Sequence, residues 1–245
     1  MYWWDGVPNF GDAIGPDLVR ALLPVDNIRH ARAGDEGVLL GPGSILDYAS
    51  KFRDVVIWGT GFDPHYGRPQ IKNATILAVR GPLTAKALGI NVPVLGDPGL
   101  LLPEIYPLKP TPNDVAVIPH HSTFRKRLRD KLFCPFRAGY RIIDPRNHWT
   151  QVVQEICRSR FVFCQSLHGA IVAHAYGVPW CWWRGWHGRR AAFKWKDWFA
   201  SIGLQPRDFR LAQLREAEVW GQRVIEHRLD AAPLRQIFLE RVTWD

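Results

Sequence analysis

The sequence has few cysteines and lacks long apolar segments. Its 245 residues include four cysteines, none in a Cys-x-x-Cys pair, so neither a disulfide framework nor a metal site is expected. Cys157 and Cys164 lie in apolar surroundings, which is typical of buried, unreactive thiols. The most apolar stretch, residues 161–183, is interrupted by glutamine, histidine, glycine and proline. It falls short of the roughly 18 uninterrupted apolar residues of a transmembrane helix.

The first residues lack the features of a secretory signal. Neither a basic segment nor an apolar stretch with a cleavage site follows Met1. Together with the sparse cysteines, this predicts a cytoplasmic location. The composition, 47% hydrophobic and 22% charged, excludes a disordered chain.

Positive charge and tryptophan are present in excess. The 32 Lys and Arg against 23 Asp and Glu give a net charge of +9. Six of the 12 tryptophans lie between residues 180 and 198. The charge predicts an anionic partner, which could be nucleic acid, a membrane surface or a phosphorylated substrate. Because no pattern of a known nucleic-acid-binding domain occurs, we do not expect nucleic acid to be the partner.

Short apolar runs alternate with amphipathic segments along the chain. Runs such as 38–40 and 161–164 are typical of buried parallel strands. Segments such as 12–23 and 149–158 carry apolar residues at helical spacing. This alternation predicts an α/β fold with parallel sheets covered on both faces.

A proline-rich stretch divides the pattern in two. Four prolines between residues 103 and 112 predict a linker. We therefore expect two α/β halves, residues 1–108 and 109–245. The second half ends in a charged helical tail, residues 216–242, which Pro233 is expected to interrupt.

Glycine-rich or polar turns follow several predicted strands. In open parallel sheets, ligands bind at the carboxyl ends of the strands, where free backbone N–H groups attract anions. Each turn alone is a weak signal, because glycine turns are common in α/β proteins. Neither a GxxxxGK(S/T) loop nor a complete GxGxxG motif occurs. The candidate residues in these turns are Asn9, Gly11, Asp12, Gly43 and Ser44.

Charged side chains follow other strand ends. Arg80 precedes a helix-starting proline and could offer a bidentate fork to a carboxylate or phosphate, or form a surface ion pair. Asp97 is either a helix N-cap or a functional carboxylate. His120, after the strand 115–118, is a further candidate for contact with an anion.

The segment Ser166-Leu167-His168-Gly169 is the most indicative of function. It follows a predicted strand and begins a predicted helix, which places His168 beside free N–H groups. A histidine in this position suits contact with an anion or donation of a proton. We therefore interpret His168 as a functional residue.

Taken in order, these segments resemble the polysaccharide pyruvyl transferase family. The resemblance implies two Rossmann-like halves with a cleft between them, similar to the GT-B glycosyltransferases. It implies transfer of a pyruvyl group from phosphoenolpyruvate to a sugar of a bacterial surface polysaccharide or its lipid-linked precursor, as a ketal and without another cofactor. The matching segments are residues 9–12, 41–44, 79–84, 95–98, 118–120 and 166–169, with a Lys-x-x-Asp-Trp pattern at 194–198.

The resemblance also implies roles for individual residues. Arg80 and His168 correspond to expected donor contacts. Some family members have an arginine where this chain has Ser166, so we expect further positive charge from His120 or Arg184. We expect His168 to contact the phosphate and act as an acid. A carboxylate, Asp12 or Asp97, is expected to activate the sugar hydroxyl.

Alternatives remain at this stage. A nucleotide-sugar glycosyltransferase of the same architecture and a repurposed family member with another acceptor both fit the motifs. The tryptophan-rich segment either packs into the core or forms an exposed edge with Trp186, Arg189 and Arg190. Such an edge would stack on the acceptor sugar or bind the inner face of the cytoplasmic membrane.

Overall fold

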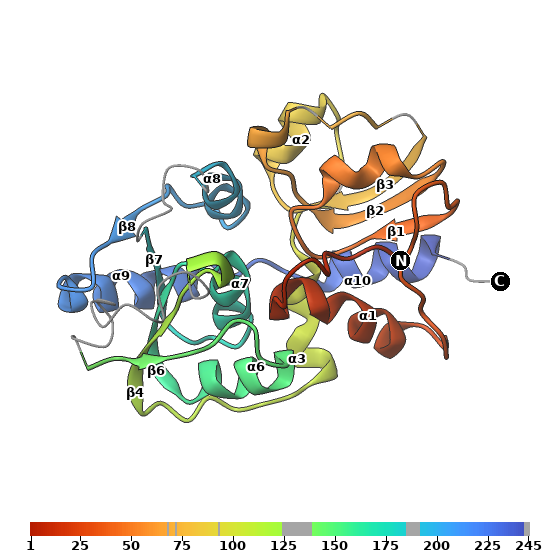
Figure 1. The fold of residues 1–245 in the computed structure, drawn as a ribbon. Helices are drawn as coiled ribbons and strands as arrows, with labels where there is room; N and C mark the ends of the chain where they lie inside the picture. Colours follow the sequence, from red (N-terminus) through yellow and green to blue (C-terminus); the bar gives the residue numbers. More distant parts are fainter. Residues whose placement is uncertain (68, 72, 93, 124–138, 185–191, 243–245) are drawn as a thin grey trace.

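The protein folds around two parallel sheets, as the predicted α/β class requires (Figure 1). The computed structural model describes residues 1–67, 69–71, 73–92, 94–123, 139–184 and 192–242. Within these ranges, no helix combines the length and the apolar character that a membrane crossing needs. Trp186, Arg189 and Arg190 lie outside the described residues, so the proposed exposed edge stays a prediction.

The first sheet contains three strands in chain order: β1 (Val38–Leu40), β2 (Val55–Thr60) and β3 (Ala74–Val79). Single parallel bridges, Tyr2 to Leu40 and Val79 to Leu95, extend it on both sides. Around Tyr2 and Leu95, the described residues thus form a single bridge each rather than a longer strand. Side chains from both faces of the sheet are buried, as expected of a parallel sheet.

Helices and 3₁₀ turns pack against both faces of this sheet. Helix α1 (Phe10–Leu22) packs into the hydrophobic core on one face, and the 3₁₀ turn η1 (Leu46–Lys51) and helix α2 (Pro82–Leu88) pack into the core on the other. A further 3₁₀ turn, η2 (Pro64–Tyr66), follows β2. Helix α2 begins at a proline, which lacks the N–H that would be unpaired there. It ends at Gly89, whose φ of 71° lies in the left-handed region that favours glycine.

The second sheet has the order β5-β4-β6-β7-β8, with all strands parallel. Its first strand in sequence, β4, thus lies between the second and the third. This is an order of doubly wound sheets, in which ligands bind at the switch point, here between the carboxyl ends of β4 and β6. The strands are β4 (Asp114–Ile118), β5 (Arg141–Ile142), β6 (Ser159–Cys164), β7 (Trp180–Trp183) and β8 (Asp208–Phe209).

Helices pack on both faces of the second sheet. One face is covered by α6 (Trp149–Cys157), α7 (Leu167–Ala175) and α8 (Ala192–Ser201). The other is covered by α9 (Leu214–Glu226), where Gly221 allows close approach to the Trp180 backbone. Tryptophans of β7 and α8 are buried, which confirms their interpretation as core residues; they are Trp180, Trp182, Trp183, Trp195 and Trp198.

Two predictions about proline were confirmed in part, with the positions shifted by a few residues. Pro103 lies in the first turn of α3 (Leu102–Ile105), which follows η3 (Pro98–Leu101), so the linker does not begin there. Pro233 lies in the first turn of α10 (Ala232–Arg241), and the tail is interrupted before it, at residues 227–231. Proline is tolerated at a helix start because it removes no intrahelical hydrogen bond there.

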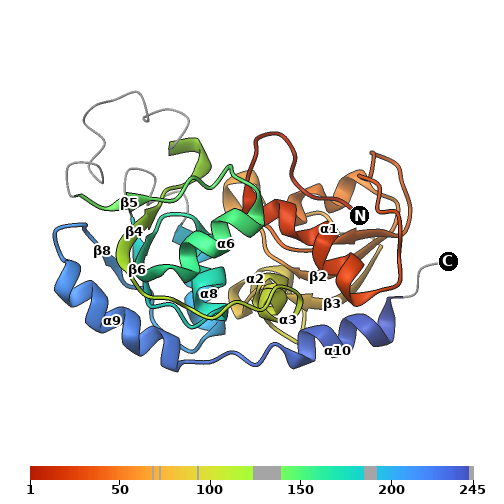
Figure 2. The ribbon, with the colours of Figure 1, turned by 90° about the horizontal axis from the view of Figure 1, so that it is seen from below.

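The C-terminal helix returns to the first sheet. Helices α9 and α10 lie along the same side of the molecule, α9 against the second sheet and α10 against the first (Figure 2). The indole of Trp58 donates a hydrogen bond to the Leu234 carbonyl at 2.9 Å and stacks on Phe238, with ring centroids 4.1 Å apart. The proposed halves, residues 1–108 and 109–245, are therefore tied together by the tail.

We predict that Phe238→Ala lowers the free energy of unfolding by about 3–5 kcal/mol, because it leaves a cavity against Trp58. Phe238 is fully buried, whereas its neighbour Leu239 is 38% exposed and provides a matched control. Leu239→Ala should cost less than about 0.5 kcal/mol. Denaturant unfolding of both variants measures the difference, and equal costs would contradict the described packing of α10.

Candidate active site

The starts of α1 and α7, which belong to different halves, meet at one point. A Cβ added to Gly11 would lie 2.0 Å from Nδ1 of His168. Glycine is therefore required at this position for the imidazole to reach the backbone of α1. Ser166 is the N-cap of α7, where its hydroxyl accepts a hydrogen bond from the Gly169 N–H at 3.3 Å. Ser166 thus supports the helix start that presents His168.

Asp97 faces the other side of the imidazole. Its Oδ2 lies 3.6 Å from Nε2 of His168, and its Oδ1 accepts a hydrogen bond from the Gly99 N–H at 2.9 Å. Asp97 is therefore both the N-cap of η3 and a carboxylate directed at the histidine. Oδ2 and Nε2 are buried and have no hydrogen-bond partner among the described residues. Since buried polar atoms are normally paired, these two are suited to bind a ligand.

Asp12 lies in the same cluster. The Asn9 amide donates a hydrogen bond to its Oδ2 at 2.5 Å. Gly43, with a φ of 127°, brings the loop after β1 so close that a Cβ there would lie 2.8 Å from Oδ1 of Asp12. Burial raises the pKa of Asp12, although His168, Asn9 and Lys194 oppose the shift. A carboxyl with a raised pKa can exchange a proton closer to neutral pH.

Arg80 follows β3 and is fully buried, which excludes the alternative of a surface ion pair. Its Nη1 donates hydrogen bonds to the Ser44 hydroxyl at 3.0 Å and to the Gly43 carbonyl at 3.4 Å. Its Nε and Nη2 have no hydrogen-bond partner within the described ranges. The loop after β1 therefore holds one side of the guanidinium, while the donors Nε and Nη2 remain available. Such a guanidinium can bind a carboxylate or phosphate.

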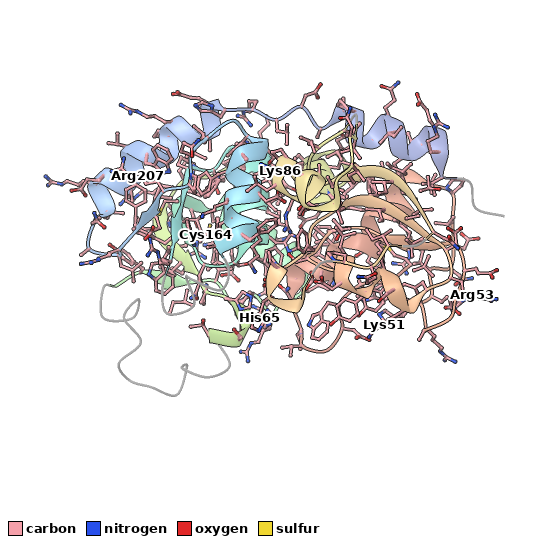
Figure 3. The ribbon with its side chains drawn as sticks, turned by 90° about the horizontal axis from the view of Figure 1, so that it is seen from above. Lys51, Arg53, His65, Lys86, Cys164 and Arg207 are labelled. Carbon is pink, nitrogen blue, oxygen red and sulfur yellow. The ribbon has the colours of Figure 1, made fainter. Side chains whose placement is uncertain are left out.

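Asp197, on α8, belongs to the Lys-x-x-Asp-Trp pattern but was not predicted to be a site residue. Its Oδ1 accepts hydrogen bonds from the Leu83 and Thr84 N–H groups at 2.9 and 3.0 Å, and its Oδ2 accepts one from the Thr84 hydroxyl at 2.6 Å. Oδ2 also lies 3.8 Å from Nε of Arg80. Asp197 therefore caps a helix of the other half. Figure 3 shows α8 beside α2, where Lys86 is labelled.

The remaining predicted residues lie in two places. The His120 N–H donates a hydrogen bond to the side chain of Gln165 at 3.0 Å, which places His120 at the switch point between β4 and β6. Its Nδ1 lies 2.7 Å from the Ser122 hydroxyl. Arg184 is instead 52% exposed and forms an ion pair with Asp208 of β8. No described contact joins Arg184 to His168.

Comparison with known proteins identifies the family. Residues 19–183 match the family model described as polysaccharide pyruvyl transferase. The chain belongs to the polysaccharide pyruvyl transferase family. It is also 32% identical, over 238 residues, to "Succinoglycan biosynthesis protein ExoV" of Rhizobium meliloti (strain 1021), covering 90% of this chain and 72% of the relative. No solved structure gives a significant match.

The match confirms the family suggested by the ordered motifs and indicates polysaccharide pyruvyl transferase activity. Arg80, Asp97 and His168 lie within the matched region, whereas Asp12 and Asp197 lie outside it. The Lys-x-x-Asp-Trp pattern was the available signal for Asp197. The pattern marks the helix α8, but it does not predict that the Asp197 carboxylate accepts hydrogen bonds from α2, which lies more than a hundred residues away in sequence.

We predict that Asp12→Asn increases stability at neutral pH. Burial raises the pKa of the folded-state carboxyl above its usual value of 3.8, although Asn9, His168 and Lys194 favour the charged form. The Asp12 carboxyl thus binds its proton more tightly in the folded protein than in the unfolded protein. The free energy of unfolding of the wild type therefore falls as the pH rises from below 3.8 through the raised pKa. Melting temperatures of both proteins between about pH 4 and pH 8 should diverge as the pH rises.

Asp26→Asn is the matched control, because it makes the same chemical change at an exposed carboxylate, where substitutions usually alter stability by less than about 0.5 kcal/mol. An Asp12→Asn variant whose melting temperature follows that of the wild type throughout this range would contradict the raised pKa of Asp12.

Proposed function

We propose that this enzyme transfers a pyruvyl group from phosphoenolpyruvate to a sugar of a surface polysaccharide or its lipid-linked precursor, forming a pyruvate ketal. One observation carries the proposal: in a chain of this family, the unpartnered donors of Arg80 and the facing pair His168–Asp97 are both buried at strand ends. The name of the relative, a succinoglycan biosynthesis protein, supports a polysaccharide acceptor.

Phosphoenolpyruvate presents a carboxylate and a phosphate, so its site needs donors on two sides. Nε and Nη2 of Arg80 can form a bidentate contact with one group. His168, in the first turn of α7, can contact the other together with the favourable end of the helix dipole. Because the two residues come from different halves, the donor would bind between the sheets.

The reaction needs two additions at the central carbon of the donor. An acid protonates the methylene carbon, and a sugar hydroxyl attacks the resulting cation while a carboxylate takes its proton. Phosphate then leaves, and a second hydroxyl of the same sugar closes the ketal and loses its proton. We assign the phosphate contact and acid to His168, and the acceptance of hydroxyl protons to Asp12 or Asp97. Phosphoenolpyruvate and a diol thus give a ketal and inorganic phosphate.

We also infer a GT-B-like arrangement of two Rossmann-like halves. The doubly wound order of the second sheet and the return of α10 to the first sheet support this inference. The free, buried thiols of Cys157, Cys164 and Cys181 support a cytoplasmic location. An acceptor carried on a lipid would place the enzyme at the inner face of the cytoplasmic membrane.

Ligand-dependent melting tests the donor. Phosphoenolpyruvate should raise the melting temperature, because it would bind only the folded protein, whereas a nucleotide sugar should not. Mass spectrometry of a lipid-linked oligosaccharide after incubation should then show the gain of one pyruvate ketal with release of phosphate. Stabilisation by a nucleotide sugar alone would favour a glycosyltransferase and contradict the proposal.

Substitution tests the two donor contacts. Arg80→Ala and His168→Ala should each lower the rate of transfer by at least about 100-fold, since each removes a charge or proton that the transition state requires. Circular dichroism checks that the variants fold, and Arg80→Lys shows whether charge alone suffices. Full activity in either alanine variant would exclude that residue from the site.

A further inference from the structure

The buried charges around the proposed donor site are unbalanced. Asp12, Asp97 and Asp197 are all buried there, and among the residues that the structure describes Arg80 is the buried one with a permanent positive charge. A donor with a carboxylate and a phosphate would add further negative charge to this cluster. Like charges repel strongly in a poorly solvated site, so binding of the donor requires another cation.

The first turn of α8 brings a lysine to this site. Phe193 packs against Phe62, with ring centroids 4.9 Å apart, and Asp197 caps α2 one turn later. In sequence, Lys194 thus lies between two residues of α8, Phe193 and Asp197, that contact the first half. Because residues three apart share a helix face, its stem projects on the side of Asp197 and the first half. Its amine is close enough to interact electrostatically with Arg80, Asp63 and Asp12.

The surroundings of Lys194 suit an anion. The residue is partly buried, and in the described part of the chain its amine has no hydrogen bond or ion pair at bonding distance. Burial, and then the charge of Arg80, lower the pKa of Lys194. An anion placed between the amine and the guanidinium would be attracted by both and would remove their mutual repulsion.

We propose that Lys194 is a donor-binding residue, which supplies the cation opposite Arg80 and contacts the phosphate of the donor. An ammonium group acts as a compact point charge suited to phosphate, whereas the fork of Arg80 suits the planar carboxylate. This inference rests on the proposed function, because it assumes phosphoenolpyruvate as the donor. Asp197, on the same helix, holds Lys194 in place through its bonds to α2.

Calorimetric titration with phosphoenolpyruvate tests the role of Lys194. Lys194→Gln should raise the Kd at least tenfold, and Lys194→Arg should recover part of the affinity. Lys196, two residues further along α8, is exposed and provides the matched control. Lys196→Gln should change the Kd less than twofold. Folded Lys194→Gln with a wild-type Kd would overturn the inference, while failure of the wild type to bind would overturn the proposed donor itself.

A second measurement needs no variant. Acetylation of wild-type protein, followed by mass spectrometry, should modify Lys194 more slowly when phosphoenolpyruvate is present. Lys196 should be modified at the same rate with and without it. Equal modification of Lys194 in both conditions, at a concentration of phosphoenolpyruvate that raises the melting temperature, would contradict contact between the donor and this lysine.

Discussion

The proposed site depends on one interaction, the capping of the first turn of α2 by the Asp197 carboxylate. A buried carboxylate costs several kcal/mol unless hydrogen bonds and opposite charge compensate it. Here two N–H groups, one hydroxyl and the nearby guanidinium of Arg80 do so. Because α8 and α2 belong to different halves, this compensation exists only when the halves are together. The position of Arg80 is therefore linked to the packing of α8.

The same dependence on both halves recurs at His168. Its ring lies against Gly11 of α1 on one side and against Asp97 of the first half on the other. The return of α10, through Trp58 and Phe238, adds a third connection across the molecule. For the proposed donor, which has two anionic ends, groups contributed by both halves are well suited, since each half can hold one end.

The sequence predicted much of the fold, because local signals determine strands and helix ends. The strand 38–40 and the helix 149–158 coincide with β1 and α6 to within one residue. Both Arg80 and Ser44 were predicted as candidates because they follow strands, and the structure joins them by a hydrogen bond. The pairing of Arg184 with Asp208 and the capping of α2 by Asp197 were not predictable, because they join segments with no sequence pattern in common. Long-range contacts of this kind are set by packing of whole elements rather than by motifs.

Calorimetric titration of phosphoenolpyruvate into Asp197→Ala tests the central claim, that a carboxylate on α8 builds the donor site of the other half. The variant retains Arg80, His168 and Lys194 but loses the cap on α2, and circular dichroism establishes that it is folded. We predict a Kd at least tenfold above that of the wild type. A folded Asp197→Ala protein that binds phosphoenolpyruvate with the wild-type Kd would contradict the claim.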